Sequence, residues 1–280
     1  MGRLRTSGAR FHDKLADTLR DMDFMPSRAD PDLWLCGQLD HYEYICVYVD
    51  DLMVMMKDPQ SFFDELETRY KYKLKGVGEP SYHLGGNFSR DPDGTLAWGA
   101  KSYIKRMLDN YKIMFGDLPK LCSSPLVVGD SPELDTSTEL GPEDIKKYQS
   151  VIGALQWCVT LGRFDIACAL MTLSRFRVAP RVGHMERAQR ICGYLRKMDD
   201  AAIRFRTLIP KNEWHYEMPD HSWLYSVYGQ GKEEVDPMDP MPRGNWVRTT
   251  TFVDANLQHC KVTGKSATGI LHFVNQTDTC

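Results

Sequence analysis

The chain has 280 residues, of which 42% are hydrophobic and 26% are charged. These fractions are close to globular averages, so they exclude a mostly disordered chain, and the length allows one large domain or two modest ones. The formal net charge of -3, taken as a sum, argues against a nucleic-acid binder.

The first part of the sequence predicts a helix, a β-hairpin and a second helix. Apolar residues at three- and four-residue steps predict a helix over residues 7–22. The runs YEYICVY (42–48) and LMVMM (52–56) are apolar, and the first is rich in β-branched and aromatic residues, so they predict the two strands of a hairpin. Apolar residues on one face predict a helix over residues 60–73.

The middle of the sequence predicts a second hairpin followed by helices. The segment DPDG (91–94) is typical of a hairpin turn, and an apolar stripe predicts a helix over residues 101–113. Four prolines and several Ser and Thr in residues 116–142 predict a linker or a long surface loop. Three helices are predicted next, over residues 142–160, 163–178 and 184–198, and a strand follows over residues 201–208.

The last part of the sequence predicts a connector and two strands. Residues 210–245 are acidic and contain five prolines, which predicts an irregular connector. Residues 246–258 and 266–274 predict two final strands, joined by a turn that contains Gly264.

Charge is distributed unevenly along these segments. Residues 122–145 contain six acids and no Lys or Arg, and residues 212–244 have a net charge of -5. Between them, residues 146–211 contain thirteen bases and four acids, a net charge of +9. Such a basic block is suited to the phosphate backbone of a nucleic acid, and a set of solvated helix faces is the alternative that charge alone leaves open.

Several other classes of protein are not expected. No apolar run approaches the roughly 18 residues of a membrane helix, and no apolar stretch follows the basic first residues as it would in a secretory signal. The eight cysteines are scattered and include no CxxC pair, which argues against a zinc site or a disulfide framework. We therefore expect a chain that is not secreted and has no membrane partner.

The segment Tyr48-Val49-Asp50-Asp51 carries the most informative chemistry. Two adjacent carboxylates at a hairpin tip cannot both enter a core, because a buried unpaired charge is too costly. Hard divalent cations such as Mg²⁺ bind carboxylate oxygens together with substrate phosphates, and a pair of such ions serves phosphoryl transfer. An ordinary exposed turn is the alternative, because Asp is common in turns.

The motif and its surroundings resemble the reverse transcriptase of copia-type retrotransposon Pol polyproteins. The resemblance is carried, in family order, by YICVYVDDLMV and by the segments 4–34, 148–176, 184–198 and 250–275. It implies an α+β fold made of a partial reverse-transcriptase palm of antiparallel hairpins plus helices, a helical connection region and an incomplete RNase H-like sheet. The implied divisions are a partial palm and thumb (1–115), an acidic linker (116–141), the connection region (142–209), an acidic irregular connector (210–245) and a truncated RNase H-like start (246–280).

The resemblance also implies a role for individual residues. Asp50 and Asp51 match the catalytic metal-binding pair of the polymerase, and Asp254 matches the first acidic metal ligand of RNase H, with Mg²⁺ or Mn²⁺ as the cofactor. The implied nucleic-acid contacts are Tyr48 and Val49 under the primer terminus, Arg5 and Arg10 at phosphates, and Arg175, Arg177, Arg187 and Arg190 along the backbone. The implied partners are an RNA template and a DNA primer, together with the remaining polyprotein segments. The implied location is intracellular, in cytoplasmic particles or the nucleus.

The sequence departs from the family pattern at both ends. In the family, a further palm Asp comes from a strand that precedes the segment seen here, and RNase H needs acids that follow it. We therefore expect little or no polymerase activity from the chain alone. The alternative functions are a noncatalytic nucleic-acid-binding remnant that uses residues 146–211, a non-functional truncated gene product, and an unrelated two-carboxylate hydrolase, for which no matching His, Lys or Ser constellation is visible.

Overall fold

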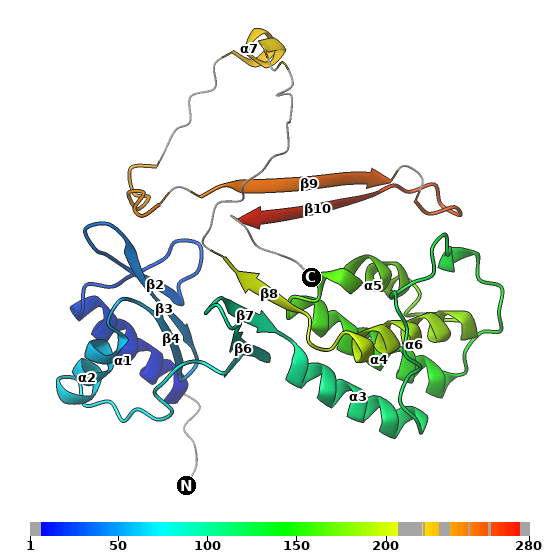
Figure 1. The fold of residues 1–280 in the computed structure, drawn as a ribbon, viewed down its shortest axis with the longest axis horizontal. Coiled ribbons are helices and arrows are strands. Elements are labelled where there is room, and N and C mark those ends of the chain that lie inside the picture. Colours follow the sequence, from blue (N-terminus) through cyan, green and yellow to red (C-terminus); the bar gives the residue numbers. More distant parts are fainter. Residues whose placement is uncertain are drawn as a thin grey trace. The chain divides into compact units, whose positions relative to one another are not determined.

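The computed structural model describes residues 7–206, 220, 222–229, 236–245, 247–256 and 259–274 (Figure 1). The fold is mixed α+β with antiparallel sheets. The chain forms two compact units: unit 1 contains Met1–Glu79 and Asn212–Trp246, and unit 2 contains Pro80–Lys211 and Val247–Cys280. The predicted palm and thumb segment, 1–115, thus contributes to both units.

The first segment of unit 1, up to Glu79, contains one antiparallel sheet with two helices packed on it. The strands are joined in the order β1-β2-β3-β4. The elements in chain order are α1 (Ser7–Asp21), β1 (Met25–Pro26), β2 (Leu33–Gly37), β3 (Tyr42–Tyr48), β4 (Asp51–Met55) and α2 (Pro59–Thr68). Ile45 and Val47 of β3 are buried against Leu19 and Leu66 of the helices. Because residues two apart on a strand share a face, both helices cover the same face of the sheet.

The predicted helix over residues 60–73 is too long. It begins at Pro59, where the Asp58 carboxylate accepts a hydrogen bond from the Ser61 amide at 3.1 Å, and it ends at Thr68. Lys71 has a φ of 61°, in the left-handed region, so the chain has left the helix by this point. Residues 71–75 continue without helix or strand.

Unit 2 combines a second antiparallel sheet with a group of helices. The sheet has the order β5-β6-β7-β8, with β5 (Tyr82–His83), β6 (Gly86–Arg90), β7 (Leu96–Gly99) and β8 (Ala202–Phe205). The helices are α3 (Lys101–Phe115), α4 (Pro142–Thr160), α5 (Ala167–Ser174) and α6 (Val182–Lys197). Buried residues from all four helices, such as Ile104, Leu155, Leu170 and Ile191, form one hydrophobic core.

The predicted helix over residues 163–178 is interrupted near its start. Gly162 has a φ of 91°, and a short 3-10 turn at Phe164–Ile166 precedes α5. Arg163, only 2% exposed, donates two hydrogen bonds to Asp165, at 3.0 and 2.7 Å, and one to the Met198 carbonyl at 2.8 Å. The buried guanidinium requires these acceptors, and the turn positions them.

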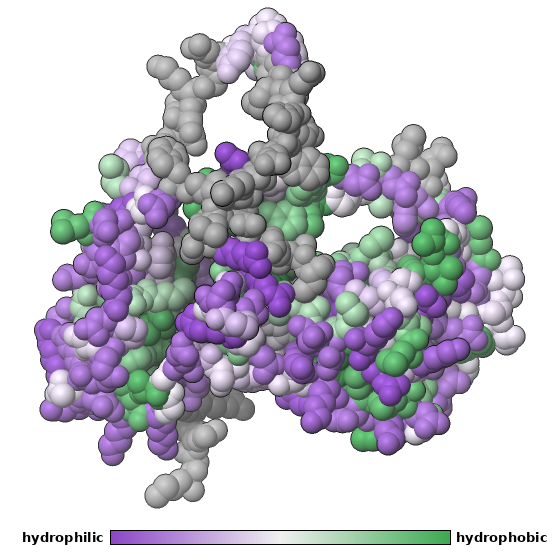
Figure 2. Space-filling model, viewed as in Figure 1, coloured by the Kyte–Doolittle hydropathy of each residue, from purple (hydrophilic) through white to green (hydrophobic). Residues whose placement is uncertain are grey.

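The two predicted C-terminal strands are confirmed as a hairpin, and the connector before them contains a helix. β9 (Thr249–Asn256) pairs with β10 (Ala267–Val274) in antiparallel register. The connector predicted as irregular over residues 210–245 contains the helix α7 (Ser222–Tyr228). None of the helices that the structure describes has the length and apolar character of a membrane span, and the face drawn in Figure 2 is largely hydrophilic with separate hydrophobic patches.

The segment predicted as an acidic linker or surface loop lies along α6. Side chains near the end of α6 bind the first residues of this segment, with Arg196 donating to the Pro119 carbonyl at 2.9 Å. The residue at the start of α6 binds the last residues of the segment, with Arg181 donating to Glu139 at 3.1 Å. The segment therefore runs antiparallel to the helix, and polar contacts hold it there.

Candidate functional site

The tip of the β3–β4 hairpin is a strained two-residue turn. Tyr48 pairs with Asp51, which leaves Val49 and Asp50 as the turn residues. Val49 has a φ of 56°, whereas Asp50 is not among the residues with positive φ. A positive φ at the first turn residue alone is the type II′ pattern, where Gly is preferred. A β-branched residue in that conformation costs about 1 to 3 kcal/mol, and such strain gathers at functional sites.

The turn presents both carboxylates to solvent. Asp50 and Asp51 are exposed, and Tyr48 and Val49 are 53% and 67% exposed. The two carboxylates offer hard oxygen ligands of the kind that Mg²⁺ takes alongside water and substrate phosphates. Among the residues described, no group of three or more His, Cys, Asp or Glu side chains is arranged to hold a metal ion. The donor set thus fits part of a divalent-cation coordination sphere.

The base of the turn is attached to α1. The Val47 amide donates to the Asp32 carbonyl at 2.9 Å, and the His12 imidazole Nε2 lies 2.9 Å from the Asp32 carboxylate. Arg10 is exposed on the same helix, while Arg5 falls outside the described residues. No local sequence pattern indicated the contact between His12 and Asp32, because they belong to separate elements.

Arg187 and Arg190, predicted to follow a nucleic-acid backbone, bind within the chain. Arg187 donates to Asp130 at 2.7 and 2.9 Å and to Asp135 at 2.6 Å, and these two carboxylates are only 16% and 9% exposed. Arg190 donates to Ser124 Oγ at 3.1 Å. Hydrogen bonds from Arg187 lower the pKa of Asp130. Both arginines thus fasten residues 116–141 to α6.

The other predicted residues of unit 2 are more accessible. Arg175 and Arg177 are exposed, with Arg175 donating to Cys260 Sγ at 3.0 Å and Arg177 to the Ser174 carbonyl at 3.2 Å. Asp254 is exposed on β9, opposite Gly269 of β10. Asp254 belongs to unit 2, and the Asp50–Asp51 pair belongs to unit 1.

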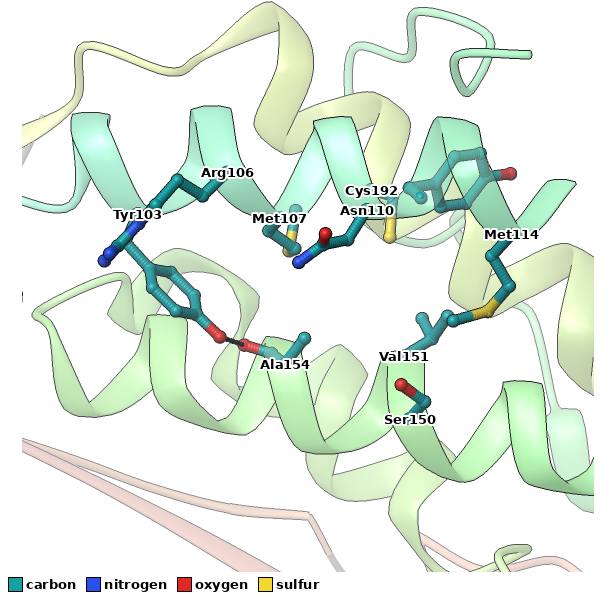
Figure 3. A pocket seen from close by; sticks show the side chains of 10 residues that line it. Tyr103, Arg106, Met107, Asn110, Met114, Ser150, Val151, Ala154 and Cys192 are labelled. Atoms are coloured by element: carbon teal, nitrogen blue, oxygen red, sulfur yellow. Dashed lines mark hydrogen bonds between the residues drawn. The ribbon is translucent and has the colours of Figure 1, made fainter. Parts of the chain in front are cut away.

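A cavity that the sequence did not indicate lies between α3 and α4 (Figure 3). It has a volume of about 360 Å³, with Met107, Val151 and Cys192 among its apolar lining residues. Tyr103 Oη donates to the Ala154 carbonyl at 3.2 Å across it. None of the predicted site residues lines this cavity.

Comparison with known proteins identifies four significant relatives, all from retrotransposons. The chain is 30% identical over 202 residues to a transposon Ty5-1 protein of Saccharomyces cerevisiae, covering 70% of this chain and 63% of that protein. It is 27% identical over 183 residues to the retrovirus-related Pol polyprotein from transposon RE1 of Arabidopsis thaliana, covering 65% of this chain and 12% of the polyprotein. A third relative, the Pol polyprotein from transposon TNT 1-94 of Nicotiana tabacum, is 23% identical over 205 residues, 69% of this chain and 15% of the polyprotein.

The matches cover only part of each relative. The chain spans less than two thirds of the length of each of them. No protein-family model matches the chain, and no solved structure matches it significantly. Relatives from yeast and plants nevertheless cover about two thirds of its sequence. Over about two thirds of its sequence, the chain is therefore similar to Ty/copia-type retrotransposon Pol polyproteins.

Proposed function

We propose that the chain is part of an RNA-directed DNA polymerase with RNase H, and that the β3–β4 tip belongs to its nucleotidyl-transfer site. The observation that carries the proposal is the turn at Tyr48–Asp51, where a strained Val49 presents two adjacent carboxylates to solvent. The similarity to retrotransposon Pol polyproteins supports it. In this proposal, the sheet and helices of unit 1 form part of a palm, and β9–β10 begins an RNase H-like sheet.

The exposed side chains of the tip have different proposed roles at this site, in metal binding and in contact with the primer. Asp50 and Asp51 would hold Mg²⁺ or Mn²⁺, with Asp50 as the firmer ligand. A divalent ion, when bound there, supplies Lewis-acid stabilisation of the charge on the attacking and leaving oxygens. Tyr48 and Val49 offer exposed apolar surface on which a primer terminus can rest. Asp254 is proposed as a metal ligand for RNase H chemistry.

The partners follow from the same proposal. A polymerase of this class takes an RNA template and a DNA primer, so the chain is expected to bind an RNA–DNA hybrid. The negative phosphates of such a hybrid supply oxygen ligands that two carboxylates alone do not. Metal affinity at the tip is therefore expected to rise when a primed template and a nucleotide are present.

Paramagnetic broadening by Mn²⁺ tests the metal site. In a titration monitored on backbone amide resonances, we expect the signals of residues 48–52 to broaden first, and D50N/D51N to abolish this effect. A DNA primer with a dideoxy end, annealed to an RNA template and supplied with the complementary nucleotide, is expected to lower the Mn²⁺ concentration required.

The β6–β7 turn provides the matched control within the same chain. It also carries two Asp residues, but Asp91 accepts a hydrogen bond from Arg204 at 2.7 Å and Asp93 accepts one from the Thr95 amide at 2.9 Å. Signals of residues 91–95 are expected to remain sharp at the same Mn²⁺ concentration. Equal broadening of both turns, or broadening at residues 48–52 that survives D50N/D51N, would mean that the tip is an ordinary acidic turn.

A further inference from the structure

Three lysines follow α2 in unit 1 in an alternating pattern. Lys71, Lys73 and Lys75 are exposed, whereas Tyr72 and Leu74 between them are half-buried against the core of unit 1. This alternation of exposed and half-buried residues places the three lysine side chains on the solvent side of the segment. Across the described part of the chain, none of the three lysines forms a salt bridge.

The segment that carries these lysines is fixed on α1. Tyr72 Oη lies 3.1 Å from Thr18 Oγ1, and the Tyr72 ring packs edge-on against Phe11 with a centroid distance of 6.2 Å. The Tyr72 amide donates to the Leu66 carbonyl at 3.0 Å. Lys14 places its ammonium group 4.6 Å from the centre of the same ring. The backbone beneath the row is therefore held in place.

The charge of the row suits a nucleic-acid backbone. Phosphates repeat along each strand of a duplex, and a lysine carries its ammonium group on a long, flexible stem. Three neighbouring lysines can therefore meet phosphates of the same backbone.

The arginines of unit 2 contrast with this row. Arg187 and Arg190 direct their guanidinium groups at acceptors within the chain, so phosphates would have to compete with those bonds. The unpaired ammonium groups of unit 1 release only water and counterions when they bind a phosphate.

We propose that Lys71, Lys73 and Lys75 form a binding strip for the sugar-phosphate backbone, which we call the lysine strip. The partner is an RNA–DNA hybrid, and in this respect the inference rests on the proposed function. The strip recognises charge, so binding is independent of base sequence and falls steeply with salt. It positions the duplex and carries no chemistry.

A salt titration with charge-matched variants tests the strip. The probe is a fluorescein-labelled RNA–DNA hybrid of mixed sequence, and binding to the full chain is measured by anisotropy between 50 and 200 mM KCl. The strip variant is K71Q/K73Q/K75Q. The control is K101Q/K105Q/K112Q, which removes the same charge from exposed positions of α3 in unit 2.

The strip variant is expected to bind at least tenfold more weakly at 100 mM KCl. Its slope of log affinity against log salt should fall by about 2 to 3, because each lost phosphate contact contributes about 0.9. The control is expected to change affinity less than threefold. Thermal unfolding of both variants should match that of the wild type, because all six lysines are exposed.

The other outcomes separate the strip from the proposed function. Equal loss in both variants would overturn the strip, because net charge alone would then set affinity. Hybrid binding by the strip variant at wild-type affinity would also overturn the strip and leave the proposed function standing. A wild-type chain that binds phosphatidylserine vesicles but no hybrid would contradict both the strip's partner and the proposed function.

Discussion

Replacement of Arg187 by alanine is expected to lower the free energy of unfolding by about 3 to 5 kcal/mol. The guanidinium of Arg187 holds Asp130 through two hydrogen bonds and Asp135 through one. Both carboxylates are largely buried, at 16% and 9% exposure. Without Arg187 both carboxylates remain in a poorly solvated place with no cation, and residues 116–141 lose one of their attachments to α6. Urea denaturation followed by circular dichroism measures the effect.

Lys147 provides the control for a surface pair. It donates to Asp144 at 2.9 Å, but the two side chains are 39% and 51% exposed. Lys147→Ala is therefore expected to cost about 1 kcal/mol or less. The triple variant R187M/D130N/D135N is expected to recover part of the stability lost in Arg187→Ala, because no charge is then left buried. Equal losses in Arg187→Ala and Lys147→Ala would contradict the structural role of the network.

The same network predicts how stability depends on pH. Burial raises the pKa of Asp135, but hydrogen bonds from Ser137 and Arg187 outweigh this effect and lower the pKa to about 2, against about 3.9 in an unfolded chain. The folded state thus binds this proton less readily than the unfolded state. The resulting stabilisation, about 2 to 3 kcal/mol, is complete above about pH 4 and is lost as the pH falls toward 2. Asp135→Asn should remove this part of the acid dependence.

Gly193 in α6 is the site of the second large effect. A Cβ atom at Gly193 would lie 1.9 Å from the carbonyl oxygen of Lys120, a backbone atom of the segment that runs along the helix. The Gly193 carbonyl also accepts a hydrogen bond from the Cys122 amide at 3.4 Å. Gly193→Ala must therefore displace the segment, and we expect a loss of about 2 to 3 kcal/mol in unfolding free energy, as for other overpacked sites.

Gly153 in α4 gives the matched comparison. It also lies inside a helix, but a Cβ atom there meets nothing within 4 Å. Gly153→Ala is therefore expected to stabilise the chain by about 0.5 to 1 kcal/mol, because Gly disfavours a helix interior. Opposite signs for the same substitution in two helices, measured by urea denaturation, support the contact at Lys120. Stabilisation by both substitutions would show that the segment does not pack on Gly193.

Local patterns predicted the elements of the fold better than their ends. The helix expected over residues 142–160 is observed with those bounds, because Pro142 begins it and Gly162 follows its end. The hairpin expected around Asp50 and Asp51 is observed as well. The helix over residues 60–73 was extended too far because Tyr70, Tyr72 and Leu74 pack on unit 1 from a nonhelical segment. In a helix, the three lysines of the strip would not share a side.

The contacts that hold elements together could not be predicted from local patterns. Arg187 and Asp130 are 57 positions apart, and the sequence around each of them alone is typical of a charged residue on the surface. The sequence therefore indicated a basic block suited to phosphates, whereas the structure uses Arg187 to bind the acidic segment. The φ of Val49 is likewise set by the hairpin register, which allows only two residues between Tyr48 and Asp51.

Photo-crosslinking from the primer terminus tests most directly the claim that the β3–β4 tip is part of a polymerase site. A DNA primer ending in 4-thiothymidine is annealed to an RNA template, bound to the full chain and irradiated, and the crosslinked peptide is identified by mass spectrometry. We predict that the crosslink maps to Tyr48 or Val49, within the peptide that contains β3 and β4. Crosslinks confined to other peptides, obtained while the chain binds the hybrid, would contradict the claim.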